Sequence, residues 1–265
     1  MKILNKIFLI ITIFALVGYS YFIEPNQLEL NKYIVQDEEL KGIKIVFASD
    51  FHIKPHQQKR LEKIVELINV QSPDIVVSAG DFVCGHTEHS TMHPQKIAEG
   101  LSKIKSKHGF YTTLGNHDGW YDRWYIKELL EEKNIKVLNN KNVKLNIKGK
   151  DIYIAGVEDV MTAFPNVEDA LQGTKSPTIL LTHNPDIFPE VPNRVNLTLA
   201  GHTHGGQVRL PIIGPLFTAS NYGNKYAIGM VEENGKKLII TRGIGVSILP
   251  VRFNCLPEIN VIEFE

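Results

Sequence analysis

The chain has 265 residues, enough for one sizeable core, and its 43% hydrophobic and 22% charged residues are typical of a globular domain. Lysine plus arginine and aspartate plus glutamate both count 29, so net charge does not favour a nucleic-acid partner, and we expect none. The two cysteines, Cys84 and Cys255, exclude a disulfide framework and a Cys-x-x-Cys zinc motif, and they leave open one bridge or two free thiols.

The N-terminus carries a segment suited to a membrane. Lys2 and Lys6 precede an uncharged run at residues 7–23, whose 17 residues are just long enough to span a bilayer. This segment is either a membrane anchor or a cleaved signal peptide. Bulky Tyr19 and Tyr21 disfavour a cleavage site, which needs small residues, and therefore favour retention.

Charge around this run predicts its orientation. The lysines precede it and several carboxylates follow it, so the positive-inside rule places the rest of the chain outside the cytoplasm. Three units follow from the composition. Residues 1–24 are the transmembrane anchor or signal segment, residues 25–42 are a polar linker or an added edge element, and residues 43–265 are the main domain.

The first half of the main domain alternates strands with helices. Each predicted strand is a short apolar run that ends in a polar motif, D-F-H, G-D or G-N-H-D in turn. These strands are expected at residues 43–49, 75–79 and 109–114. The helices, expected from their apolar periodicity, lie at residues 57–70, 94–107 and 120–133.

The second half is richer in hairpins. Alternating apolar and polar residues predict hairpins at 142–157 and 225–241, and further strands at 178–182, 196–200 and 257–264. Parallel units followed by hairpins predict an α/β fold, a layered sandwich of two mixed β-sheets flanked by helices.

Two histidines in a glycine-flanked segment stand out after the strand at 196–200. His202 and His204 are separated by one residue, and in extended backbone such positions face the same way. They lie just past a strand's carboxyl end, where open α/β sheets usually bind ligands. The segment is therefore predicted to bind metal.

The other strand ends carry similar side chains. Any one of these motifs is common by chance, but together, in this order and each after an apolar strand, they predict a metal site. The set consists of carboxylate, imidazole and carboxamide side chains: Asp50, His52, Asp81, Asn116, His117, Asp118, His183, His202 and His204.

The order D-x-H, G-D, G-N-H-D, H, G-H-x-H resembles the calcineurin-like metallophosphoesterases. The later runs Q-V-R-L-P-I-I-G-P-L-F and R-G-I-G look like the membrane-associated bacterial branch of that family. The resemblance implies that residues 43–265 form a metallophosphoesterase catalytic domain with two metal ions. By the same resemblance Asp50, His52 and His204 hold the first ion, Asn116, His183 and His202 hold the second, and Asp81 bridges them.

Physical chemistry supports this assignment of Asp81. Two divalent ions about 4 Å apart repel each other, so a shared carboxylate between them is needed. The expected nucleophile is a metal-bridging hydroxide, which suits hydrolysis of a phosphodiester or a pyrophosphate. Nitrogen and oxygen ligands without thiolate favour Mn, Fe or Zn over Mg.

Residues beside these ligands are candidates for proton transfer and substrate contact. We expect His117 to protonate the leaving group or stabilise its charge, with Asp118 fixing its tautomer. Arg242 and Arg252 are expected either to grip a phosphate or to form salt bridges. The loop histidines are expected either to be solvated or to contact substrate, and they are His86, His89 and His93.

Three functions remain open at this point. The favoured one is a membrane-tethered phosphoesterase acting on a phosphorylated small molecule or lipid. An alternative that the resemblance offers is a hydrolase of UDP-2,3-diacylglucosamine type, whose substrate is cytoplasmic, and another is a non-catalytic metal-binding scaffold. The apolar run at residues 210–217 is expected to be either core or an exposed rim that meets membrane or acyl chains.

Overall fold

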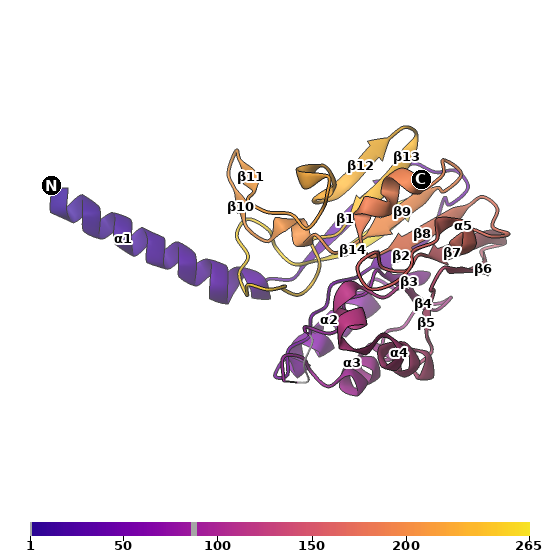
Figure 1. The fold of residues 1–265 in the computed structure, drawn as a ribbon, viewed down its shortest axis with the longest axis horizontal. Helices are drawn as coiled ribbons and strands as arrows, with labels where there is room; N and C mark the ends of the chain where they lie inside the picture. The colour runs from indigo at the N-terminus through magenta and orange to yellow at the C-terminus, as the bar shows by residue number, and fades with distance from the viewer. Residues whose placement is uncertain (1, 86–88) are drawn as a thin grey trace.

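The computed structural model describes residues 2–85 and 89–265 and contains two six-stranded mixed sheets (Figure 1). The first sheet has the order β1 (Glu29–Val35), β14 (Glu258–Phe264), β2 (Lys44–Phe47), β3 (Ile75–Ser78), β4 (Phe110–Thr112), β5 (Ile135–Val137). The second has the order β12 (Gly229–Glu233), β13 (Lys236–Ile240), β9 (Leu197–Ala200), β8 (Thr178–Thr182), β7 (Lys150–Gly156), β6 (Lys141–Ile147). The predicted sandwich of two mixed sheets is confirmed.

The core between the sheets follows from side-chain alternation along the strands. On β2, Ile45 and Phe47 point toward the second sheet, whereas Val46 joins the cluster under the helices. On the second sheet Ile154 and Leu181 belong to the same inter-sheet cluster. All five side chains are fully buried, so burial of apolar surface joins the two sheets.

Helices cover the outer face of the first sheet and lie together below the sheets in Figure 1. They are α2 (Gln58–Val70), α3 (Pro94–Leu101) and α4 (Asn116–Glu132). Four apolar residues of α2 at helical spacing are buried against the sheet, namely Leu61, Ile64, Val65 and Ile68. The second sheet carries shorter elements outside it, namely α5 (Val167–Ala170), η3 (Pro185–Glu190) and η5 (Gly223–Tyr226).

Most predicted elements are present, with shifted ends. The predicted helix at 94–107 is shorter and ends at Leu101, while α4 begins before its predicted start, inside the G-N-H-D motif. Three short strands had no counterpart in the prediction: β5, β10 (Arg209–Leu210) and β11 (Gly214–Pro215). Of the two possibilities for Cys84 and Cys255, one disulfide bridge or two free thiols, the structure shows two free thiols.

The N-terminal segment projects from the domain as α1 (Lys2–Gly18) and continues through η1 (Tyr19–Ile23) and η2 (Glu24–Asn26) (Figure 1). Within the described residues, the stretch Ile3–Asn26 is a helix of 24 residues with mean hydropathy 2.0, long and apolar enough to cross a membrane.

The base of this helix is attached to the domain. The Arg252 backbone N–H donates to the Ser20 carbonyl oxygen at 2.9 Å, and the Cys255 N–H donates to Glu24 Oε1 at 2.5 Å. Glu24 is buried. Next along the chain, β1 pairs in parallel with β14. Of the two alternatives for residues 25–42, a linker or an added edge element, the structure therefore supports the edge element.

Candidate metal centre

The seven predicted ligands converge at one edge of the sandwich. They follow the carboxyl ends of β2, β3, β4, β8 and β9, so both sheets contribute to the site. Six of the seven side chains are buried and His202 is partly buried. The sequence therefore predicted correctly which side chains come together, while their role as ligands stays a prediction.

The first group consists of Asp50, His52 and His204. His52 Nε2 lies 3.1 Å from His204 Nε2, and His204 Nε2 lies 3.6 Å from Asp50 Oδ1. Asp50 Oδ2 is buried and has no hydrogen-bond partner among the described residues. A buried carboxylate oxygen without a donor is costly, which a cation between these three side chains would relieve.

The second group consists of Asn116, His183 and His202. Asn116 Oδ1 lies 2.8 Å from His183 Nε2 and 2.9 Å from His202 Nδ1. The two imidazole nitrogens are themselves 3.1 Å apart. One amide oxygen and two ring nitrogens are thus directed at a single small volume.

Asp81 lies between the two groups. Its Oδ2 is 3.4 Å from His52 Nε2 and 3.3 Å from His183 Nε2, so one oxygen faces both sides. Its Oδ1 accepts a hydrogen bond from the His117 backbone N–H at 2.8 Å. This is the position that a carboxylate shared by two cations requires.

Ring tautomers support the same interpretation. His52 Nδ1 lies 3.0 Å from the Val83 carbonyl oxygen, and His183 Nδ1 lies 2.8 Å from the Ala79 carbonyl oxygen. A carbonyl oxygen only accepts, so each Nδ1 carries a proton and Nε2 is the nitrogen of each ring that is directed at the site and available to a metal ion. Such fixed imidazoles, together with Asp50 Oδ2, fit divalent metal ions.

The electrostatics favour neutral imidazoles, the form that binds metal. Burial lowers the pKa of His52 and of His202 to about 3, and burial lowers the pKa of His204 well below its usual value. His183 differs. Burial opposes its charge, but the adjacent Asp81 carboxylate raises the pKa of His183 to about 10.

The carboxylates at the site differ in the same way. Burial raises the pKa of Asp50 to about 6. Burial also raises the pKa of Asp81, but the nearby His183 and His52 lower it by more. The pKa of Asp81 is therefore well below its usual value. Asp81 is therefore the more firmly ionised carboxylate and the stronger attractor of cations.

The backbone at the ligands is strained. Five of the seven predicted ligands have positive φ, namely Asp50 at 53°, His52 at 41°, Asp81 at 56°, His202 at 71° and His204 at 50°. The extended backbone predicted for His202 and His204 is therefore wrong. Left-handed turns direct His202 into the second group and His204 into the first, and such strain is typical of functional sites.

Two glycines allow the close approach of these segments. A side chain at Gly115 would collide with the Asp81 carboxylate, and one at Gly201 would collide with that of Asp50. The glycines of G-N-H-D and G-H-x-H are thus required by packing around the carboxylates.

Asp118 has a different contact set from the one predicted. Its side chain is fully buried, and its two oxygens accept hydrogen bonds from backbone N–H groups. The donors are Asp81 at 2.7 Å, Phe82 at 2.9 Å, Val83 at 3.3 Å and Gly115 at 3.0 Å. Asp118 therefore ties the Asp81 loop to the start of α4, and its role in fixing the His117 tautomer stays a prediction.

His117 borders the centre from α4. Its ring stacks edge-on against His52, with centroids 4.6 Å apart, and its Nε2 lies 3.3 Å from Ser247 Oγ. One ligand atom each of His117, His52 and Asp81 also lie close enough to hold an ion, which makes His117 a competing ligand candidate.

The two arginines serve the fold. Arg242 forms ion pairs with Glu258 at 2.5 Å and with Glu29 at 2.8 Å. Arg252 is fully buried and donates to the carbonyl oxygens of Arg242, Gly243, Gly245 and Cys255. For both arginines the structure therefore supports a structural role and not the binding of a phosphate.

Two further predictions concern loops. Residues 210–217 are not core, because Ile212, Ile213, Leu216 and Phe217 are largely exposed. Of the loop histidines, His86 lies outside the described residues, and His89 and His93 are exposed.

Sequence reasoning missed a pocket next to His52 to which Lys54 and Arg60 contribute. Lys54 stands two residues after His52, a spacing that could have flagged it. Arg60 and the N-terminal side of the pocket had no local signal, since only the fold brings them there.

The fold and this cluster define the class of protein. The structure is similar to that of the NAD nucleotidase of Haemophilus influenzae, with a TM-score of 0.52 and 19% sequence identity. The similarity covers 77% of this chain and 45% of the nucleotidase, and it shows a shared fold. Within this fold, the buried histidine and aspartate side chains form groups that could hold metal ions, as in a metal-dependent hydrolase.

The family follows from sequence. Residues 43–206 match the calcineurin-like phosphoesterase model, and the chain belongs to that family. It is 33% identical to the uncharacterized metallophosphoesterase YkuE of Bacillus subtilis, over 94% of this chain and 89% of that protein. It is 27% identical to the phosphodiesterase YaeI of Escherichia coli, over 93% and 92%. A transmembrane protein with a metallophosphoesterase domain from Danio rerio is 31% identical, over 85% of this chain and 54% of that protein.

Replacing Asp81 tests the metal centre. Asp81→Ala removes the oxygen that lies 3.4 Å from His52 Nε2 and 3.3 Å from His183 Nε2. We expect elemental analysis to fall from about two transition ions per chain to one or fewer, with hydrolysis abolished. Asp151→Asn, an exposed carboxylate on β7, is the matched control and should keep both ions. Full activity and full metal content in Asp81→Ala would exclude the shared carboxylate.

Proposed function

We propose that this protein is a dinuclear metal-dependent phosphodiesterase tethered to a membrane by its N-terminal helix. The observation that carries the proposal is the position of Asp81 Oδ2, 3.4 Å from His52 Nε2 and 3.3 Å from His183 Nε2. The phosphodiesterase YaeI, similar over nearly the whole chain, supports the choice of a diester.

The residues proposed to hold the ions follow the two groups. Asp50, His52 and His204 serve one ion, Asn116, His183 and His202 serve the other, and Asp81 serves both. Two divalent ions bound there lower the pKa of water, orient it and neutralise phosphoryl charge. The donor set contains imidazole, carboxylate and amide but no thiolate, which favours Mn, Fe or Zn over Mg.

The protein's own groups complete the reaction. His117 lies beside His52 and its Nε2 faces Ser247 at the entrance of the site. From this position it donates a proton to the leaving oxygen or stabilises its charge. Asp118 holds the backbone of the Asp81 loop, so it positions the carboxylate without meeting the substrate.

A metal-binding scaffold without turnover is the alternative of another class. Every predicted ligand is present, and His117 is a proton donor that a scaffold does not need. Both observations support an enzyme.

His117→Asn separates these functions. The variant keeps a polar side chain at the centre but cannot supply a proton, and a general acid typically contributes about 10² to 10⁴-fold to the rate. We expect that loss in kcat with two ions still present by elemental analysis. A variant that loses an ion would make His117 a ligand, and one with unchanged kcat would favour another proton donor. Ser247→Ala, which removes only the neighbouring hydroxyl, is the control and should change kcat little.

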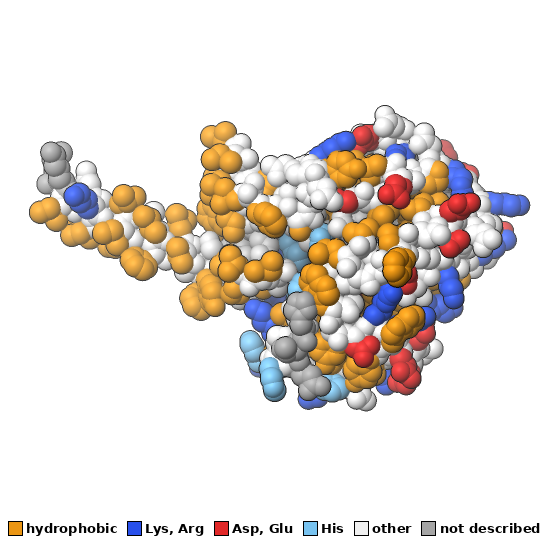
Figure 2. Space-filling view, in the orientation of Figure 1, with side chains coloured by type: hydrophobic (Ala, Val, Ile, Leu, Met, Phe, Trp, Pro, Cys, Tyr) orange, Lys and Arg blue, Asp and Glu red, His pale blue; other side chains and the backbone are white. Residues whose placement is uncertain are grey.

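An apolar surface beside the centre supports a substrate with an acyl or other apolar arm. Ile212, Ile213, Leu216, Phe217, Ile248 and Leu249 form what we term the apolar rim. Orange side chains of the β10–β11 region stand beside α1 in Figure 2. A groove of about 390 Å³ runs from His202 and His204 to Phe217 and Leu249. Large exposed apolar surfaces next to a membrane helix are suited to lipid.

Two substitutions on the rim test this substrate class. Ile212 and Ile213 are exposed, so replacing both with Ser should leave the thermal unfolding temperature unchanged. We expect the double variant to lose at least tenfold in kcat/KM on an acylated phosphodiester in detergent micelles and to keep its rate on bis(p-nitrophenyl) phosphate. Equal loss on both substrates would remove the support for a lipid-facing rim.

The side of the membrane on which the catalytic domain lies determines which lipid substrates it can reach. Lys2 and Lys6 lie at the N-terminal end of α1, before its uncharged run, so we propose an extracytoplasmic catalytic domain. This orientation conflicts with a cytoplasmic substrate of UDP-2,3-diacylglucosamine type.

Reporter fusions after Glu265 measure the orientation directly. We expect an alkaline phosphatase fusion to be active and a fluorescent protein that folds only in the cytoplasm to be dark. The opposite pair of results would contradict the orientation and favour the UDP-lipid substrate.

A further inference from the structure

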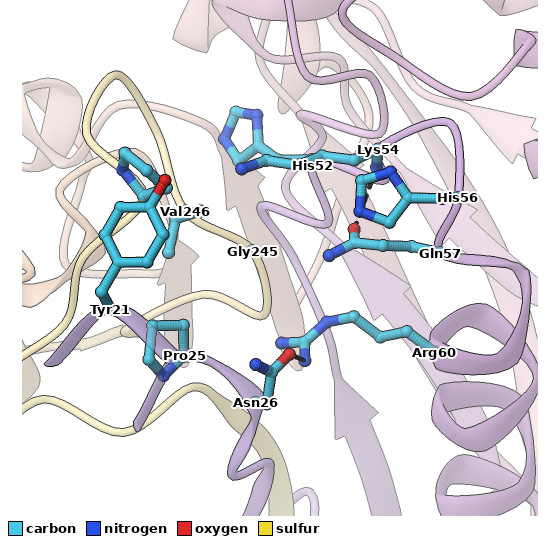
Figure 3. A pocket seen from close by; sticks show the side chains of 11 residues that line it. Tyr21, Pro25, Asn26, His52, Lys54, His56, Gln57, Arg60, Gly245 and Val246 are labelled. Carbon is cyan, nitrogen blue, oxygen red and sulfur yellow. Dashed lines mark hydrogen bonds between the residues drawn. The ribbon is translucent and has the colours of Figure 1, made fainter. Parts of the chain in front are cut away.

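A second cavity borders the metal centre on the side of His52. It has a volume of about 290 Å³ and lies between the start of α2, the loop at residues 245–250 and residues 21–26 at the end of the N-terminal helical stretch, which we term the membrane-proximal segment. Figure 3 shows the side chains of Lys54, His56, Gln57 and Arg60 across from those of Tyr21, Pro25 and Asn26. One cavity is therefore bounded both by a predicted metal ligand and by the membrane-proximal segment.

The charge of this cavity is positive. Lys54 and Arg60 line it, and no carboxylate is among its lining residues. Neither cation forms an ion pair with a carboxylate within the ranges 2–85 and 89–265. Burial, followed by the charge of Arg252, lowers the pKa of Arg60 only to about 10, so Arg60 stays protonated at neutral pH.

Arg60 has a structural contact that Lys54 lacks. Arg60 Nη2 donates to the Ile244 carbonyl oxygen at 2.6 Å, and its Nη1 donates to Asn26 Oδ1 at 3.5 Å. These bonds hold the loop and the membrane-proximal segment against α2. The Lys54 ammonium has no hydrogen-bond partner among the described residues, although its backbone N–H is bonded to Gln57 Oε1 at 2.9 Å. Lys54 is therefore the cation whose role the fold does not explain.

Two cations line this cavity with no carboxylate among its lining residues, so the cavity is suited to an anion. A phosphate or carboxylate there accepts charge-assisted hydrogen bonds from both groups. The cavity shares His52 with the predicted metal centre, so a molecule of modest size can reach both.

We propose that this cavity is a subsite for a second anionic group of the substrate, a phosphate or a carboxylate, held by Lys54 and Arg60. The inference rests on the proposed phosphodiesterase function and narrows its substrate to a diester that carries a further anion on one arm. The opposite arm faces the apolar groove beside His202 and His204. Tyr21, Pro25 and Asn26 close the subsite, so the membrane-proximal segment takes part in substrate selection.

Three substrates with one chromophore test the subsite with the full-length protein in detergent and Mn²⁺. They are the p-nitrophenyl phosphodiesters of glycerol, of glycerol 3-phosphate and of glycerate, which differ only in the second anion. We expect wild type to show a KM about tenfold lower for an anionic substrate than for the glycerol diester, as one charge-assisted hydrogen bond supplies. The better of the two anionic substrates identifies phosphate or carboxylate.

The variants are chosen to separate charge from folding. Lys54→Gln should abolish the preference for the second anion, so that KM for the anionic substrates equals KM for the glycerol diester. Lys59→Gln, an exposed lysine on α2 outside the cavity, should retain the preference. An equal KM for all three substrates in wild type, or a preference that survives in Lys54→Gln, overturns the subsite.

Failure of the proposed function gives a different result, since then none of the three diesters is hydrolysed. In that case calorimetry with glycerol 3-phosphate still decides the subsite. Weaker binding to Lys54→Gln than to wild type and to Lys59→Gln supports it, and equal binding to all three proteins overturns it.

Discussion

The structure depends on one buried carboxylate, that of Asp81, which faces the imidazoles of His52 and His183 with the same oxygen. Burying a carboxylate among several imidazoles in a small volume is unfavourable unless cations are shared among them. The surroundings are built to hold this arrangement. Asp118 binds the backbone of the Asp81 loop, glycine stands where a side chain would strike a carboxylate, and five predicted ligands adopt left-handed backbone. Such strain persists only where the neighbouring contacts over-determine it.

The N-terminal helix is bonded to the same part of the structure. Its base is bonded to the loop that precedes β14, through Ser20 with Arg252 and through buried Glu24 with Cys255. Arg252 in turn donates to the carbonyl oxygens of Gly243 and Gly245, beside the predicted ligand Asp50. The apolar rim, the groove and the cationic cavity therefore keep a fixed relation to the helix. Under the proposed function, this arrangement would direct the polar and apolar parts of a substrate to different sides of the predicted metal centre.

Local patterns in the sequence were sufficient for the ligands and for the layers. Each ligand motif directly follows an apolar strand, and the carboxyl ends of the strands meet, so Asp50, Asp81 and His183 could be placed together in advance. What the sequence left open or did not indicate depends on contacts distant in sequence. The edge strand β1 pairs with β14, and the bond from Cys255 to Glu24 joins the two ends of the chain. The extended backbone assumed at His202 and His204 was wrong, because the fold imposes positive φ there against intrinsic preference.

The central claim is that two metal ions share Asp81. Electron paramagnetic resonance of the full-length protein loaded with Mn²⁺ tests it most directly, because two ions bridged by one carboxylate are magnetically coupled. The account predicts the spectrum of an exchange-coupled pair at two ions per chain. The spectrum of isolated Mn²⁺ at full loading, with no coupling, would contradict it.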